Sequence, residues 1–329
     1  MRHIFARAAF LLAALALPAS AYAQSCSGSN LLSKMAAEDP DRLARIEADA
    51  AKAVNGEGLF WRIEKPGTKP SYLFGTVHLT DDRLTDLPQA VRDALTSSER
   101  VIVENTDVLD PQAGAAALAA NAKYVSFTDG DTLSAHLNDS DKALLGQFFG
   151  GTLAPVDQMK PWMLAVALAV PVCEMQRRAG HLVVDAVVAK LATEKGIDVI
   201  GLESVREQLS AFDGIALSIQ ADFLMSTARL INMREDLFAT MGALYLERRV
   251  AMIDALSRDL SDRTGISQES YDVFSRQLVQ RRNKIMAERA APNVNKGGSF
   301  IAVGALHLPY ETGLVEEFRK QGYTVTRLD

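Results

Sequence analysis

Apolar, β-prone runs alternate with stretches of helical periodicity along this chain, and that alternation predicts an α/β fold. Two of the runs share one layout: residues 71–78 read SYLFGTVH, and residues 299–307 read SFIAVGALH. Each run ends in Gly-x-x-His followed by Leu, and each precedes a helical pattern and another β-prone run. The two histidines, His78 and His307, are therefore expected at the exits of two strands.

The rest of the pattern predicts a mixed sheet with flanking helices and a large helical insertion. Further strands are expected at 59–64, 99–104, 197–203 and 323–327. Helices are expected at 30–53, 87–96, 110–122, 183–195 and 311–321, with one buried helix at 162–175 and a loop at 291–298. The insertion covers about 206–290, where apolar residues recur at a heptad interval, as packed amphipathic helices require.

The first 23 residues have the pattern of a secretory signal peptide. Arg2 and Arg7 precede an apolar run, and Ala21-Tyr22-Ala23 is a small-residue cleavage pattern. Cleavage would leave 24–329, read as a single domain of an exported, periplasmic protein without a membrane span. It would also move the formal charge from −6 to about −8, which disfavours nucleic acid as a partner.

The chain contains two cysteines, Cys26 and Cys173. An oxidising compartment permits a disulfide between them, and the alternative is two separate thiols. The even count and the position of Cys26 in an otherwise untethered arm favour the bridge.

Four polar residues stand at the predicted ends of four strands. They are His78, Glu104, Glu203 and His307. Ligands of open α/β sheets bind outside the carboxyl ends of the strands, so these side chains are candidates for one shared site. Two imidazoles and two carboxylates suit either a divalent metal or metal-free acid–base pairs. Gly75 and Gly304 would let the backbone turn sharply or approach a ligand closely.

Other catalytic signatures are missing from the sequence. It has no HExxH, no G-x-S-x-G, no P-loop and no G-x-G-x-x-G, and neither cysteine has a catalytic setting. These absences disfavour a serine or cysteine hydrolase.

Several segments resemble the TraB/GumN/PrgY family, which includes the animal Tiki proteins. They are YLFGTVHL, VIVE, KPWMLA, VIGLESVREQL, RRNKIMA and VGALHLPYETGLVEEFRKQGYTV, and they extend from about Gly58 to the C-terminus. The resemblance implies a fold related to erythromycin-esterase-like and haem-binding ChaN-like proteins. Tiki members are regarded as metal-dependent proteases, with the two Gly-x-x-His histidines and a glutamate in the active site.

Carried over by position, the resemblance implies that His78, His307 and Glu104 lie in the active site. The donor types suit Mn²⁺, Co²⁺ or Zn²⁺, with His78 and His307 as ligands and Glu104 or Glu203 as ligand or general base. Glu203 matches the acid of the Gly-Leu-Glu segment, and Arg282 and Asn283 match an Arg-Asn helix motif. These two residues would either support the site by orienting a carboxylate or a substrate group, or form an ordinary charged helix face. Asp185 matches a further acid, although a position at a helix N-terminus already explains it.

The leading hypothesis is an exported metal-dependent hydrolase that acts on a peptide or a small molecule. The alternatives are a metal-free His/Glu hydrolase and a non-catalytic protein that binds haem, a metal or a peptide. The oligomeric state is left open.

Overall fold

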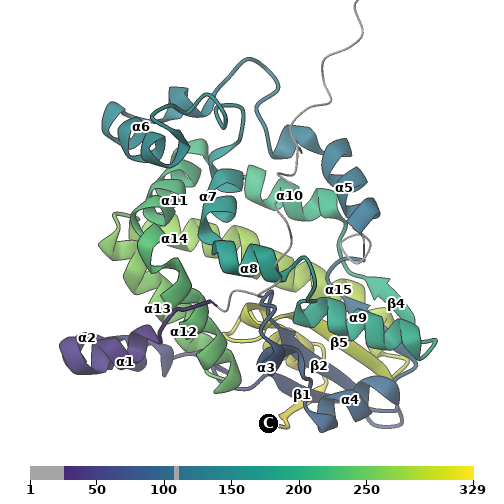
Figure 1. Ribbon diagram of the computed structural model, residues 1–329. Helices are drawn as coiled ribbons and strands as arrows, with labels where there is room; N and C mark the ends of the chain where they lie inside the picture. Colours follow the sequence, from purple (N-terminus) through teal and green to yellow (C-terminus); the bar gives the residue numbers. More distant parts are fainter. Residues whose placement is uncertain (1–25, 107–110) are drawn as a thin grey trace, which may run out of the picture.

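The computed structural model, which describes residues 26–106 and 111–329, contains a six-stranded mixed sheet, seen in the lower right of Figure 1. The strand order is β4-β3-β5-β2-β1-β6. The strands are β1 (Phe60–Glu64), β2 (Ser71–Thr76), β3 (Arg100–Val103), β4 (Asp198–Gly201), β5 (Ser299–Gly304) and β6 (Thr324–Arg327). β4, β3, β5 and β2 are parallel neighbours, whereas β1 pairs antiparallel with β2 and β6. The predicted mixed α/β architecture is confirmed.

Helices flank the sheet and share its apolar core. α4 (Gln89–Thr96) and α9 (Val184–Glu194) pack together against the parallel strands. α15 (Arg281–Val294) and α16 (Leu314–Lys320) pack against each other, and Met286 and Phe318 join the same core as the strand residues. Both strands that carry a Gly-x-x-His motif are almost completely buried, because they are interior strands of the sheet.

The other helices form two further cores. α1 (Leu31–Glu38), α2 (Pro40–Ala50), α12 (Arg234–Leu246) and α13 (Val250–Arg263) enclose one of them. The other lies among α6 (Asp139–Gly146), α7 (Pro161–Ala169) and α11 (Leu217–Arg229). The remaining helices are α3 (Asp82–Thr85), α5 (Pro111–Ala120), α8 (Val172–Arg177), α10 (Val205–Asp213) and α14 (Gln268–Ser275). From Val205 to Val294 the chain is helical apart from connecting turns, where the sequence predicts an insertion.

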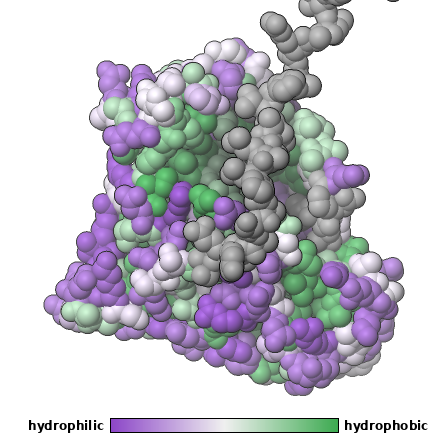
Figure 2. Space-filling model, viewed as in Figure 1, coloured by the Kyte–Doolittle hydropathy of each residue, from purple (hydrophilic) through white to green (hydrophobic). Residues whose placement is uncertain are grey.

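Apolar and polar surfaces are unevenly distributed. Figure 2 shows apolar residues over the upper helices, in the region of α7 and α11, and hydrophilic residues around α1 and α2. In the part of the chain that the structure describes, no helix is long and apolar enough to cross a membrane. The predicted signal peptide lies outside the described residues.

Three sequence-based helix boundaries are wrong, and proline explains two of them. The helix expected at 30–53 breaks at Asp39, because Pro40 begins α2 and has no backbone N–H to continue α1. The helix expected at 162–175 breaks at Pro171, and Val172 and Met175 in its second half are exposed rather than buried. The loop expected from 291 instead begins after Val294, because α15 accommodates an internal proline.

Cys26 and Cys173 form a disulfide with a Cα–Cα distance of 5.4 Å, which confirms the predicted pairing. The bridge spans 147 positions and ties the N-terminal arm to the second residue of α8.

Candidate functional site

The strands that carry the two Gly-x-x-His motifs are direct neighbours. β2 and β5 are parallel, and the last residues of each, Thr76 and Gly304, are paired in register. β5 also pairs in parallel with β3, and β3 with β4. The carboxyl ends of parallel strands meet at one edge of a sheet. The fold therefore brings all the predicted catalytic residues to one edge: His78 after β2, Glu104 after β3, Glu203 after β4 and His307 after β5.

His307 is buried, and its protonation pattern follows from its neighbours. Its Nδ1 lies 2.6 Å from Oδ1 of Asn283. The amide nitrogen of Asn283 donates to the carbonyl of Thr312 at 2.7 Å, which leaves Oδ1 as the acceptor. His307 therefore donates from Nδ1, and the lone pair on Nε2 is free. Burial lowers the pKa of His307 to about 4 despite the opposing charge of Glu104, so His307 is neutral at pH 7.

Glu104 has partners for both carboxylate oxygens. Oε1 accepts from the backbone N–H of Gly304 at 2.7 Å and lies 3.7 Å from Nε2 of His307. Oε2 accepts from Arg282 at 2.7 Å and from Gln208 at 3.2 Å. Burial would raise the pKa of Glu104, but the charges of His307 and Arg282 and the N–H of Gly304 outweigh it and lower the pKa to about 2. Because His307 is neutral at pH 7, Arg282 and the protonated His78 are the cations that keep Glu104 ionised there.

Arg282 lies between the two glutamates of the predicted site. Its Nε contacts Oε1 and Oε2 of Glu203 at 3.1 and 3.0 Å, and its Nη2 donates to Glu203 at 2.6 Å and to Glu104 at 2.7 Å. The side chains of Arg282, Glu104 and Glu203 are 13%, 14% and 3% exposed. Both oxygens of Glu203 accept from Arg282, so Glu203 is linked to the rest of the site through the guanidinium.

His78 lies on the loop that follows β2 and pairs with Asp185 in the first turn of α9. Its Nδ1 is 2.9 Å from Oδ2 of Asp185, and the hydroxyl of Thr76 donates to Oδ1 of the same carboxylate. The charge of Asp185 and its hydrogen bond to the ring raise the pKa of His78 to about 9. The ring is 68% exposed, so water screens this pair. The explanation of Asp185 as only a helix N-terminal acid is incomplete, because Asp185 also holds His78.

The two motif glycines make room for these contacts. A Cβ at Gly75 would lie 2.6 Å from a methyl group of Leu308 and 3.1 Å from the backbone Cα of Ala305. Gly75 thus lets the short 3₁₀ helix that carries His307, Ala305–His307, pack directly on β2. A Cβ at Gly304 would lie 3.3 Å from Oε1 of Glu104, where the backbone N–H of Gly304 now donates.

A π-helical turn, Arg276–Gln280, immediately precedes Arg282 and Asn283. Such turns insert a residue into a helix and are frequent at functional sites. Here the turn lies between α14 and α15, beside the 3₁₀ helix that carries His307. Arg282 and Asn283 can therefore face different partners, the carboxylate pair and His307.

His78, His307 and Glu104 are residue types that bind metals, but as they lie in the described residues they do not surround one common ion position. Two donors about 2.1 Å from one ion lie about 3–4 Å apart, and His307 and Glu104 satisfy that spacing. Both histidines use Nδ1 for an orienting partner, which is the common arrangement of metal-ligating histidines that bind through Nε2. Within 26–106 and 111–329, however, no group of three His, Cys, Asp or Glu side chains could hold a metal ion as placed.

The sequence did not identify Gln208 as a site residue, and it indicated too small a role for Asp185. Gln208 contacts Glu104 from the first turns of α10, and only its place in the family-like VREQL segment hinted at this. Asp185 matched a family acid but was assigned to helix capping. Neither contact can be recognised from periodicity, because each joins elements about 100 residues apart.

Comparison with known proteins agrees with the motif resemblance. The chain is 23% identical over 313 residues to a protein of Amphimedon queenslandica described as "Metalloprotease TIKI homolog". The match covers 82% of this chain but 61% of that protein's length. No solved structure matches the chain, so the specific likeness to erythromycin-esterase-like and ChaN-like folds stays a prediction. The model of the TraB/PrgY/gumN family matches residues 59–327, and the chain therefore belongs to this family.

Proposed function

We propose that this protein is an exported metal-dependent hydrolase whose divalent ion binds between His307 and Glu104. One observation carries the proposal: the free Nε2 of neutral His307 faces the ionised Oε1 of Glu104 at 3.7 Å. Both atoms are electron-pair donors, and a cation held between them would satisfy both. The spacing suits an ion with bonds of about 2.1 Å to each donor.

The surrounding residues keep these donors ready to bind. Arg282 and the backbone N–H of Gly304 keep Glu104 ionised, and Asn283 keeps the proton of His307 on Nδ1. His78 is the third residue of the proposed ligand set, with Asp185 on its Nδ1; because the free ring is protonated at pH 7, binding of an ion through Nε2 would release a proton. A divalent ion would supply a Lewis acid and lower the pKa of water from about 15.7 to about 7.

Peptides are the proposed substrates, because the sponge relative is described as a metalloprotease homologue. Zn²⁺, Mn²⁺ and Co²⁺ are the candidate ions, since imidazole and carboxylate ligands suit all three. The disulfide is compatible with export to an oxidising compartment such as the periplasm.

A metal-free hydrolase is a second candidate, and the opposite pKa shifts of the two histidines favour it. His307, with a pKa lowered to about 4, is neutral at pH 7 and can accept a proton. His78, with a pKa raised to about 9, is protonated and can donate one. Pairs of titratable groups whose environments drive their pKa values apart often serve as base and acid.

Metal analysis combined with chelation tests the proposal. Purified protein should bind about one Zn²⁺, Mn²⁺ or Co²⁺ per chain, and hydrolysis of a peptide panel should stop on chelation and return with the ion. His307→Ala and Glu104→Gln should each abolish tight binding and hydrolysis. Their effects should not add, because either loss disables the same unit.

His136→Ala is the matched control, because His136 pairs with Asp131 in a different part of the chain. This variant should bind the ion and turn over substrate as the wild type does. Full turnover after exhaustive chelation would refute the metal-dependent reaction in favour of the acid–base pair. Tight binding of a metal, haem or peptide without turnover would identify a binding protein instead.

A further inference from the structure

Helix α8 lies beside the loop that carries His78 and has little apolar anchoring of its own. Its two buried residues are Cys173 and Glu174. Val172 and Met175 are exposed by 47% and 48%, so they contribute little burial of apolar surface. The position of α8 therefore depends on what Cys173 and Glu174 contact.

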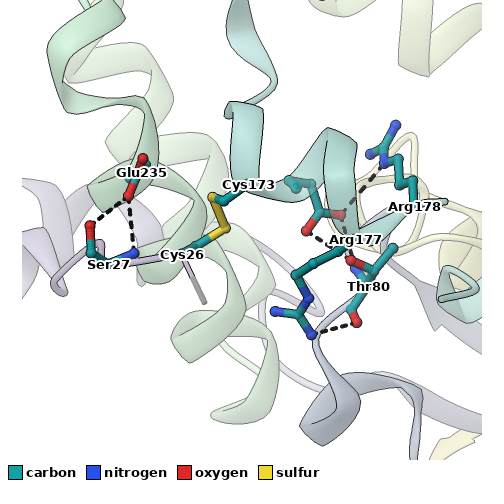
Figure 3. The surroundings of a disulfide bond; sticks show 8 residues. Cys26, Ser27, Thr80, Cys173, Arg177, Arg178 and Glu235 are labelled. Atoms are coloured by element: carbon teal, nitrogen blue, oxygen red, sulfur yellow. Dashed lines mark hydrogen bonds and ion pairs between the residues drawn. A yellow bond between two sulfur atoms is a disulfide. The ribbon is translucent and has the colours of Figure 1, made fainter. Parts of the chain in front are cut away.

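Three side chains from the α8 region hold the backbone of the loop between β2 and α3, and Figure 3 shows Arg177 donating to Thr80 of this loop. The carboxylate of Glu174 accepts from the backbone N–H of Thr80 at 3.0 Å and from its hydroxyl at 2.9 Å, and both contacts are buried. Arg177 donates to the carbonyl of Thr80 at 2.8 Å. Arg178 donates to the carbonyl of His78 itself at 2.7 Å. The backbone on which the imidazole of His78 is mounted is thus fixed from α8.

The disulfide attaches α8 to an arm that is itself fixed on α12. After Cys26, the backbone and hydroxyl of Ser27 donate to Glu235 at 3.0 and 2.8 Å. The backbone of Ser29 donates to Asp236 at 2.7 Å, and that of Leu31 donates to Thr240 at 2.8 Å. These contacts connect α12, the arm, the disulfide, α8 and the His78 loop in one continuous chain of interactions.

We propose that Glu174, Arg177 and Arg178 are positioning residues for His78, and that the Cys26–Cys173 disulfide makes this positioning sensitive to reduction. The inference rests on the proposed function in one respect, the role of His78 as a metal ligand. A dithiol would supply two electrons and two protons: its own sulfurs join in a disulfide, and Cys26 and Cys173 become thiols. A cavity of about 250 Å³ lined by Cys26, Glu174 and Arg177 borders the bridge on the side of Cys26.

Hydrogen exchange of the Thr80 amide measures this positioning without any assay of activity. Reduction of the folded protein with dithiothreitol should accelerate exchange at Thr80 at least tenfold, and reoxidation should restore the original rate. The amides of Ile102 and Ile301, in β3 and β5, should keep their rates. An unchanged exchange rate at Thr80 would overturn the claim that reduction loosens the His78 loop. Equal acceleration at Ile301 would also overturn it, because the disulfide would then stabilise the whole fold rather than this loop.

Variants with the disulfide intact test the positioning residues themselves. Glu174→Gln should accelerate exchange at Thr80 about tenfold and weaken Zn²⁺ binding about tenfold. Glu194→Gln is the matched control, since Glu194 forms an exposed pair with Lys190, and it should change neither quantity.

The two proposals fail in distinguishable ways. A wild type that binds no metal would refute the proposed function, while exchange at Thr80 would still decide whether α8 holds the loop. Faster exchange in Glu174→Gln with unchanged Zn²⁺ affinity would overturn the positioning role.

Discussion

Replacing Arg282 by Ala should destabilise the protein more than almost any other single truncation of a charged residue. The guanidinium donates to both glutamates of the site, and the three side chains are at most 14% exposed. Removing one partner of a buried ion pair leaves an uncompensated charge, which costs about 3–5 kcal/mol. Here two carboxylates, Glu104 and Glu203, lose their common cation, so we expect the upper part of that range at pH 7.

The loss of stability in Arg282→Ala should depend on pH. The pKa of Glu104 determines whether the loss grows or shrinks as the pH falls. In the wild type the pKa of Glu104 is lowered to about 2, so its contribution to stability is present above pH 4.5 and is lost as the pH falls through 2. Without Arg282, one of the groups that oppose the effect of burial is gone, and the folded-state pKa of Glu104 should rise. Proton uptake would then stabilise the variant relative to the wild type as the pH falls, so its deficit should be smaller at pH 5 than at pH 7.

Urea unfolding followed by circular dichroism at pH 7 and pH 5 measures this deficit. Arg281→Ala is a close control, because Arg281 is the preceding residue on the same helix and its side chain makes an exposed contact with Gln277. The control should lie within about 0.5 kcal/mol of the wild type. A deficit below about 1 kcal/mol for Arg282→Ala, or one equal at the two pH values, would refute the assignment of Arg282 as the buried counter-ion.

Two further variants test the motif glycine and the orientation of His307. Gly75→Ala should cost about 1–3 kcal/mol in urea unfolding, because the new Cβ would overlap Leu308, whereas Gly180→Ala, with open space around it, should be nearly neutral. A neutral Gly75→Ala would contradict the close approach to β2. Asn283→Ala should weaken metal binding by about 10–100-fold in calorimetric titration, because His307 would lose the acceptor that fixes its tautomer. Unchanged affinity would show that Asn283 serves the fold alone.

The amino-acid sequence alone determined the local features of this protein. Six β-prone runs became the six strands, because alternation and β-branched composition act over a few residues. The two Gly-x-x-His motifs placed His78 and His307 directly after strand ends. The pairing of Cys26 with Cys173 also followed, since the chain offers these two cysteines alone.

Helix boundaries were less predictable, and the errors have local causes that compete with periodicity. Pro40 and Pro171 interrupt patterns that read as continuous helices, whereas the proline near the end of α15 does not. A proline at the start of a helix is tolerated because its missing N–H would be unpaired there anyway.

The tertiary structure decided which polar groups became partners. Arg282 lies between Glu104 and Glu203, Asp185 holds His78, and Glu174 holds the loop after β2. Each contact joins residues separated by roughly 80–180 positions. Periodicity reports only which face of an element is buried, whereas a buried charge is stable only beside a counter-charge that chain topology delivers. The sequence therefore indicated where the site would form, and the packing of α9, α15 and α8 around the sheet edge determined how its residues are held.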